Sequence, residues 1–285
     1  MRFTVSKGFL IYAQNTKDVD YIQQAYALAL SIKYSQSTVK NISLVTNDVV
    51  PEKYSKIFDQ IIPIPWFESA GESPLQAEHR WKLYYTTPYD ETIVLDADMF
   101  VLGDISLWWD YCSNFDIKFC NKIKNYKLEP ILQDTYHRKT FIANNLPNPY
   151  FALHYFKKNQ PSFEFYKILE FVVKNWEFCR GTFAPLEPQE WISMDLAASI
   201  ALVISGMQDD AIDVLNPLEF IHMKPAIQGW NSTPISWRNY VNSVLNSKGE
   251  FVVGNIKQEK IFHYVEKDFI NEKIINRLEE LAYGS

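Results

Sequence analysis

Segments with strand and helix patterns alternate along the first third of the chain, and this order constrains the fold more than any other feature. Strands are expected where short apolar runs lie between turn-forming residues, and helices where apolar residues recur every three or four positions. The expected strands are 8–14, 41–48, 60–65 and 91–98, and the expected helices are 18–35, 51–58 and about 75–87. Such alternation predicts an α/β fold with a parallel, doubly wound sheet that binds ligands at the carboxyl ends of its strands.

The second half of the chain is less regular. Further strands are expected at 116–120, 149–156, 219–223, 250–254 and 260–265, and further helices at 162–178, 187–205 and about 268–283. The polar segment 121–147 is poorly patterned, and we interpret it as a surface loop, with a mobile lid or an acceptor-binding loop as alternatives. Its basic residues and histidine are Lys122, Lys124, Lys127, His137, Arg138 and Lys139. No linker or internal repeat divides the sequence, so 1–285 is expected to form a single domain.

Charge and composition limit the classes of function. The 285 residues carry 28 Lys and Arg against 34 Asp and Glu, which gives a formal net charge of −6. Nucleic-acid binding is therefore disfavoured, whereas a local basic pocket for one diphosphate remains compatible with this total. The N-terminal apolar run is too short for a signal peptide, and no stretch approaches a membrane span. Cys112, Cys120 and Cys179 form neither a disulfide framework nor a metal motif, so we expect free thiols in a soluble cytoplasmic protein.

Two carboxylates follow the strand expected at 91–98. The apolar residues 93–95 end in Asp96-Ala97-Asp98. In an extended segment, residues two apart point the same way, so both carboxylates are expected on one face at the ligand-binding edge of the sheet. Like charges this close need a neutralising cation, and oxygen ligands favour Mg²⁺ or Mn²⁺. Because D-x-D also occurs in ordinary acidic turns, the motif gains weight only from its position after a buried strand.

The residues around this pair resemble those of the GT-A nucleotide-sugar transferases, especially glycosyltransferase family 8, which includes glycogenin and bacterial lipopolysaccharide galactosyltransferases. The resemblance rests on K-L at 82–83, Y-D at 89–90 and L-D-A-D-x-x-V-L at 95–102. It implies a GT-A, Rossmann-like α/β fold whose mixed central sheet is flanked by helices. It also implies a metal-dependent glycosyltransferase that takes a sugar from a nucleotide-diphosphate sugar, with UDP as the expected nucleotide, and retains the anomeric configuration.

The resemblance assigns the donor-binding residues to the first part of the chain. It implies a nucleotide-binding half at 1–120 and an acceptor half at 121–285. Arg80 or Lys82 is expected to face the diphosphate, where a cation suits phosphate oxygens. Lys82 is expected to stabilise the leaving diphosphate together with the metal. The end of the first strand and the metal motif supply the remaining implied donor contacts, which are Tyr12, Ala13, Gln14, Asn15, Asp96 and Ala97.

Sugar contacts are implied further along the chain. Asn148 matches the asparagine of a family N-x-G segment, but Tyr150 stands where the glycine is expected. Asp195 matches the aspartate of a family D-Q pair, but Leu196 replaces the glutamine. Asp195 therefore has two interpretations, a contact to the transferred sugar or a carboxylate that stabilises a helix N-terminus.

The third metal ligand implied by the resemblance is a histidine on a late strand, followed by a lysine. His263 with Lys267 and His222 with Lys224 are the two candidates. We favour His263 because its distance beyond Asp195 suits the family, and a neutral imidazole is a good ligand for such metals. Lys267 is then expected to contact the donor phosphates.

Other functions remain as alternatives. A non-catalytic nucleotide-sugar-binding module would account for the missing glycine and glutamine. A haloacid-dehalogenase-like phosphatase also uses D-x-D, but normally after its first strand, and would have to recruit Asp209 and Asp210. A sugar-phosphate nucleotidyltransferase would need a glycine-rich loop after the first strand, and residues 14–17 contain no glycine. The acceptor, whether glycan, protein or lipid, is not indicated.

Overall fold

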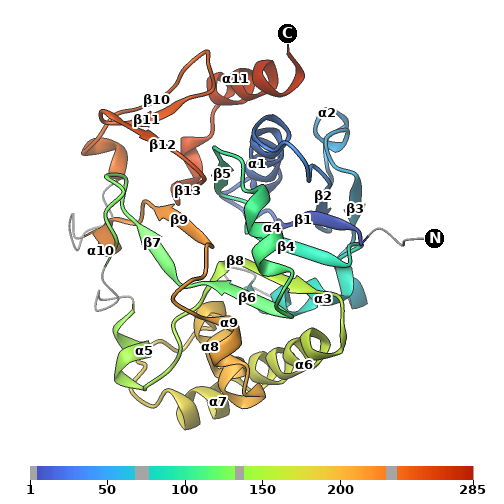
Figure 1. Ribbon diagram of the computed structural model, residues 1–285, viewed down its shortest axis with the longest axis vertical. Helices are drawn as coiled ribbons and strands as arrows, with labels where there is room; N and C mark the ends of the chain where they lie inside the picture. The colour runs from blue at the N-terminus through green and yellow to red at the C-terminus, as the bar shows by residue number, and fades with distance from the viewer. Residues whose placement is uncertain (1–4, 68–76, 132–137, 229–235, 285) are drawn as a thin grey trace.

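The computed structural model describes residues 5–67, 77–131, 138–228 and 236–284. At its centre lies a six-stranded sheet in the order β3-β2-β1-β4-β8-β6 (Figure 1). Its strands are β1 (Lys7–Tyr12), β2 (Ile42–Val45), β3 (Gln60–Ile62), β4 (Glu91–Asp96), β6 (Ile117–Cys120) and β8 (Tyr150–Lys157). The first four are parallel, whereas β8 is antiparallel to both β4 and β6. The mixed sheet is thus confirmed, and the expectation of an entirely parallel one is wrong.

Helices cover both faces of this sheet (Figure 1). On one face lie α1 (Tyr21–Ser35) and α11 (Glu272–Tyr283), and on the other α6 (Gln160–Lys174) and α8 (Met194–Ser205). Side chains alternate along a strand, so β1 sends Phe9 and Ile11 into the first core and Leu10 and Tyr12 into the second. Burial on both faces accounts for the continuous apolar runs of β1 and β4.

A second sheet brings the end of the chain next to the end of β4. Its order is β5-β13-β9-β7, formed by β5 (Met99–Val101), β13 (Ile261–His263), β9 (Glu219–His222) and β7 (Lys122–Lys124). In the register of this sheet, His263 pairs with Met99 on one side and with His222 on the other. A three-stranded antiparallel sheet of β10 (Ser243–Leu245), β11 (Phe251–Val253) and β12 (Ile256–Gln258) lies beside it.

Several expected helices have different bounds in the structure. The helix expected at 187–205 begins only at Met194, because Ser193 caps it by accepting a hydrogen bond from the backbone N–H of Leu196. The helix expected at 162–178 ends at Lys174, and α7 (Trp176–Phe183) follows after Asn175 adopts a non-helical conformation.

The remaining helices are short. The segment expected as a helix at 75–87 is a 3₁₀ helix, η2 (Ala77–Lys82), followed by α3 (Leu83–Thr86), and residues 75–76 lie outside the described part. The expected loop at 121–147 contains β7 and α5 (Lys139–Ala143), while His137 lies outside the described residues. The other short helices are η1 (Pro65–Phe67), α2 (Glu52–Ser55), α4 (Ser106–Cys112), α9 (Gln208–Ala211), α10 (Pro225–Gln228), η3 (Trp237–Asn239) and η4 (Lys267–Phe269).

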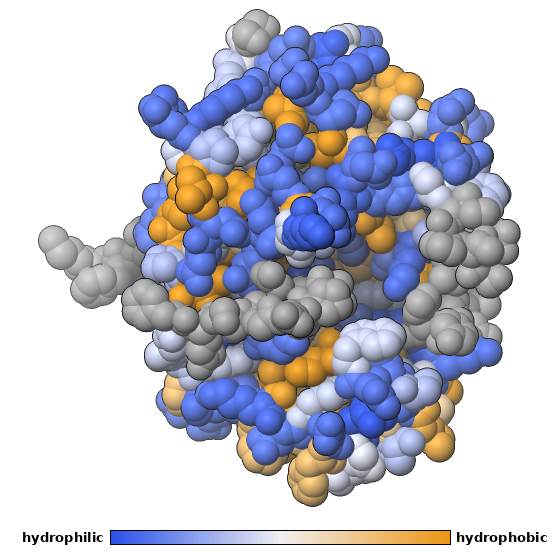
Figure 2. All heavy atoms as spheres, turned by 180° about the vertical axis from the view of Figure 1, so that it is seen from behind, coloured by the Kyte–Doolittle hydropathy of each residue, from blue (hydrophilic) through white to orange (hydrophobic). Residues whose placement is uncertain are grey.

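The three cysteines are buried and unpaired, which confirms that they are free thiols. Within the described ranges, no helix combines the length and apolar character needed to cross a bilayer. On the face opposite to that of Figure 1, apolar side chains lie in separate groups among polar ones (Figure 2).

Candidate metal centre and its cavity

The two carboxylates of the D-x-D motif lie where the two mixed sheets meet. Asp96 is the last residue of β4 and pairs with Tyr12 at the end of β1. Ala97 and Asp98 then form a turn that leads into β5. The expectation of a fully extended segment is therefore wrong for Asp98, because the chain turns there to enter the second sheet. The turn nevertheless keeps the two carboxylates close together.

His263 completes a group of three possible metal ligands. It lies opposite Met99 in the sheet, so its ring reaches back to the carboxylate one residue earlier, with 2.8 Å between His263 Nε2 and Asp98 Oδ2. One ligand atom each from Asp96, Asp98 and His263 lies within 4.8 Å of the others. Two carboxylate oxygens and one imidazole nitrogen form a ligand set suited to Mn²⁺ or Mg²⁺. The chemistry and spacing of these residues therefore fit a divalent cation.

Two basic side chains balance the acidic pair. Arg80 Nη1 lies 2.6 Å from Asp96 Oδ1, and the Lys267 ammonium forms an ion pair with Asp98. Burial alone would raise the pKa of Asp98, but the adjacent His263 and Lys267 outweigh it and hold that pKa well below its usual range. Asp98 is therefore ionised at neutral pH, as a metal ligand must be.

The geometry distinguishes His263 from His222. The two rings are neighbours, with centroids 4.9 Å apart. His222 Nδ1, however, accepts a hydrogen bond of 3.1 Å from the backbone N–H of Lys224. Burial lowers the pKa of His222 well below its usual value, and nearby His263 and Lys224 lower it further. His222 is thus a neutral residue behind the ligand, and His263 is the histidine that reaches the acidic pair.

Replacing His263 with alanine should weaken Mn²⁺ binding much more than replacing His222 with alanine. Loss of a direct ligand should cost more than the 10- to 100-fold that is typical when a residue supporting a ligand is lost. The test is Mn²⁺ titration of both variants by isothermal calorimetry. A larger loss in His222→Ala would move the ligand assignment to His222.

The acidic pair opens into a cavity of about 390 Å³. Near the ends of β1 and β4 it is lined by Tyr12, Gln14, Tyr21 and Arg80. Its other lining residues come from α5 and the residue before it, β8, the first residues of α8 with the segment before them, β9 with the residues after it, and β13 with the residues after it. Among these are Arg138, Tyr150, Glu187, Trp191, Asp195, His222 and Lys224. A concave site with convergent charged groups is the usual form of a small-molecule site.

Two of the basic residues expected at the diphosphate are placed differently. Arg80 lines the cavity, whereas Lys82 lies outside its lining, fully buried, and donates a 3.2 Å hydrogen bond to the carbonyl oxygen of Pro65. Residues two apart on a helix project in different directions, so Arg80 and Lys82 of η2 cannot both face the cavity. Arg80 is therefore the residue of this pair that meets the carboxylates.

Several other residues implied by the resemblance also lie outside the cavity lining. Ala13 and Ala97 are buried backbone neighbours of the site. Asn15 accepts a 3.1 Å hydrogen bond from the backbone N–H of Ile22, so it stabilises the start of α1. Asn148 is buried, and its side-chain nitrogen and oxygen have no hydrogen-bond partner in the described part of the chain.

Asp195 lines the cavity and holds two other parts of the cavity wall, Arg138 and the backbone of β8, by hydrogen bonds. Its Oδ2 accepts a 2.6 Å bond from Arg138 Nη1, and its Oδ1 accepts a 2.7 Å bond from the backbone N–H of Phe151. The Arg138 guanidinium in turn stacks on the ring of Tyr150, 3.6 Å from its centroid. Sequence reasoning assigned Arg138 only to an irregular basic segment and gave Trp191 no role, because neither belongs to a motif.

The fold is that of the GT-A glycosyltransferases, and known structures of that class superpose on nearly the whole chain. The galactosyltransferase LgtC, in complex with donor and acceptor sugar analogues, matches with a TM-score of 0.53 and 11% identity over 97% of this chain and 95% of LgtC. Mouse xyloside xylosyltransferase 1 matches with a TM-score of 0.51 and 11% identity, covering 91% of this chain and 98% of the mouse protein. The expected likeness to this class is thus confirmed at the level of fold.

Some similar structures are much longer than this chain. The bifunctional glycosyltransferase WbbM matches with a TM-score of 0.53 and 13% identity, and this chain spans 51% of it. The chain spans 60% of GlyE of Streptococcus pneumoniae TIGR4. No family model and no curated protein sequence matches this chain.

Proposed function

We propose that this protein is a metal-dependent glycosyltransferase that takes a sugar from a nucleotide-diphosphate sugar, with UDP as the expected nucleotide. The observation that carries the proposal is the grouping of Asp96, Asp98 and His263 at the cavity, at the carboxyl end of β4. In open α/β sheets, ligands bind outside the carboxyl ends of the strands. The GT-A fold supports the same class of reaction by analogy alone.

The residues of this cavity have distinct proposed roles. Tyr12 and Gln14, at the end of β1, would hold the base and ribose. Asp96, Asp98 and His263 would hold Mn²⁺ or Mg²⁺, which when bound supplies positive charge to the departing diphosphate. Arg80 and Lys267, now paired with the two carboxylates, would turn toward phosphate oxygens.

The main catalytic effect of these cations would be to stabilise the leaving nucleotide diphosphate. Negative charge grows on the diphosphate as the glycosidic bond breaks, and fixed cations stabilise it without further rearrangement. We assign this role to Arg80 in place of Lys82, since Arg80 lines the cavity. Lys82 would act indirectly, by ordering the segment that presents Arg80. Asp195 would position Arg138 beside the transferred sugar, and the retaining outcome stays an expectation from the resemblance.

The alternatives predict different observations. A haloacid-dehalogenase-like phosphatase would have another fold, and this chain has the GT-A fold. A non-catalytic binding module is favoured by Leu196, which is buried in the core where the family glutamine would offer an amide. Binding without turnover would support the module, whereas release of UDP from a UDP-sugar would support the enzyme.

UDP should stabilise the protein only when the metal is present. At 100 times the dissociation constant, a ligand that binds only the folded state adds about 2.7 kcal/mol. For a chain of this size, each kcal/mol corresponds to a rise of roughly 2–4 °C in Tm. The measurement is a thermal-shift panel of UDP-, GDP-, CMP- and dTDP-sugars with Mn²⁺ or with chelator. Equal shifts with and without Mn²⁺ would contradict the metal-dependent mechanism.

A further inference from the structure

Lys224 is a basic side chain at the wall of the cavity, and it forms no ion pair within the described part of the chain. It follows β9, is half-buried and lines the cavity. Among the described residues, no ion pair or hydrogen bond engages its ammonium group. Burial lowers the pKa of Lys224, Asp195 acts to raise it, and Arg138 acts to lower it further. Holding a partly desolvated ammonium in this way costs free energy unless a ligand compensates for it.

The surroundings of Lys224 carry an excess of positive charge. Among the described residues, Asp195 is the acidic group whose charge acts to raise the pKa of Lys224. Both of its oxygens already accept hydrogen bonds, from Arg138 and from the Phe151 backbone. Arg138 is itself almost fully buried, and its guanidinium group lies over the ring of Tyr150. Two cations thus share one carboxylate, since the neighbouring His222 is neutral by burial.

A chain of contacts relates this group to the metal centre. The His263 ring packs against His222, and the backbone N–H of Lys224 donates to His222. The His222 ring also lies edge-on to Tyr150, with centroids 6.4 Å apart, and Tyr150 carries Arg138. Along these contacts Lys224 is separated from the metal ligand by the ring of His222, and Arg138 by the rings of His222 and Tyr150. Because both residues line the same cavity as the metal ligands, the sugar attached to the diphosphate, or the acceptor next to it, would be placed beside them.

We propose that Lys224, supported by Arg138, binds an anionic substituent of a sugar substrate, a carboxylate or a phosphate. The inference rests on the proposed function, because the position of the sugar follows from a diphosphate held at Asp96, Asp98 and His263. Asp195 supplies one negative charge for the two positive charges of Lys224 and Arg138, and the bound anion would supply the second. A charge-assisted hydrogen bond in a partly buried site is among the stronger polar interactions.

The anionic group has two possible sources, which binding measurements separate. If it belongs to the donor, UDP-glucuronic acid should bind at least about tenfold more tightly than UDP-glucose in the presence of Mn²⁺, which corresponds to ~1.4 kcal/mol. If it belongs to the acceptor, glucuronate or glucose 6-phosphate should bind the Mn²⁺–UDP complex in preference to glucose. Isothermal calorimetry on the full chain measures both preferences.

Variants of Lys224 test whether this residue causes the preference. Lys224→Met should remove the preference for the anionic sugar, and Lys224→Arg should retain most of it, while affinity for UDP itself changes less than about twofold in both. Lys257→Met removes a lysine of β12 that pairs with Glu250 outside the cavity, and it should change neither value. Circular dichroism checks that each variant is folded.

The results distinguish this inference from the proposed function. If UDP binds with Mn²⁺ but no anionic sugar is preferred, or if the preference survives in Lys224→Met, the inference is wrong and the proposed function stands. If UDP does not bind at all, the proposed function fails. Preferential binding of glucuronate or glucose 6-phosphate to the protein without nucleotide, lost in Lys224→Met, would then still support the anion site.

Discussion

Asp98→Asn should abolish both sugar transfer and the metal-dependent binding of UDP while leaving the protein folded. Asp98 is the most deeply buried member of the ligand group, and its carboxylate contacts both His263 and Lys267. The amide keeps the shape of the side chain but removes its negative charge, so the site loses a charged oxygen ligand and keeps Lys267 as a repelling cation. Affinity for Mn²⁺ should fall by more than about 100-fold, beyond the usual effect of losing a supporting residue.

The measurements are Mn²⁺ and UDP titrations by calorimetry and release of UDP from a UDP-sugar. Asp110→Asn is the matched control, because Asp110 lies exposed on α4, outside the cavity lining. This control should bind and react as the unchanged protein does. Normal Mn²⁺-dependent UDP binding in Asp98→Asn would show that the acidic pair is a structural turn.

The acidic pair could be found from the sequence because its signal is local. A buried strand followed by D-x-D specifies both an apolar segment and the place where it ends, and β4 ends at Asp96. The turn at Asp98 could not be found in the same way. It depends on β13, more than 160 residues later, which pairs with β5 and draws the chain into the second sheet.

The position and direction of β8 could not be predicted from the sequence either, because they also depend on residues far apart in the chain. Strand-helix alternation predicts parallel neighbours, but β8 enters between β4 and β6 in the opposite direction. A strand that is buried on both faces has a continuous apolar sequence whether it runs parallel or antiparallel to its neighbours. The sequence of β8 therefore does not indicate its direction. The choice depends on long-range pairing alone.

The residues at the sugar end of the cavity were the hardest to predict. Arg138 stands in a poorly patterned segment, and Lys224 was considered only as a neighbour of a possible metal ligand. Their significance comes from Asp195 and Tyr150, which the fold brings to Arg138 from other elements. By contrast, the sequence could not show which of Arg80 and Lys82 faces the cavity, because residues two apart on a helix project in different directions and the outcome depends on how η2 packs.

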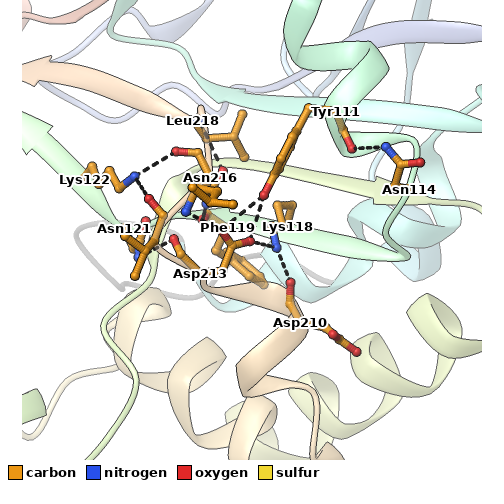
Figure 3. A network of polar contacts seen from close by, with 12 residues as sticks. Tyr111, Asn114, Lys118, Phe119, Asn121, Lys122, Asp210, Asp213, Asn216 and Leu218 are labelled. Carbon is orange, nitrogen blue, oxygen red and sulfur yellow. Dashed lines mark hydrogen bonds and ion pairs between the residues drawn. The ribbon is translucent and has the colours of Figure 1, made fainter.

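A buried lysine on β6 ties the central sheet to the segment between α8 and β9 (Figure 3). Lys118 is fully buried, forms an ion pair with Asp213 and donates to the carbonyl oxygen of Asp210. Its ammonium also lies 3.6 Å from the centroid of the Phe115 ring. Tyr111 donates to both carboxylate oxygens of Asp213, at 3.1 and 3.0 Å. The buried charge is therefore fully partnered, and removing one partner leaves it uncompensated.

Asp213→Ala should destabilise the protein by roughly 3 kcal/mol, near the lower end of the range for breaking a buried ion pair, because the Asp213 side chain is 28% exposed. Lys118→Met should cost less, about 1 kcal/mol, since methionine fills the apolar part of the site and Asp213 keeps Tyr111 and solvent. Urea unfolding of both variants measures the difference, with Lys257→Met as a surface control. Equal losses in the two variants would show that the pair acts through packing and not through charge.

The dependence on pH provides an independent check of the same ion pair. Burial acts to raise the pKa of Asp213, but hydrogen bonds from Lys118 and Tyr111 outweigh it, so the folded-state pKa lies below the usual value. A carboxylate of this kind contributes stability above the unfolded-state pKa of about 3.9 and loses it as the pH falls through the lower, folded-state value. The gap in unfolding free energy between the unchanged protein and Asp213→Ala should therefore be full at pH 7 and narrow below about pH 4. A gap that stays constant over this range would mean that the charge of Asp213 contributes nothing to it.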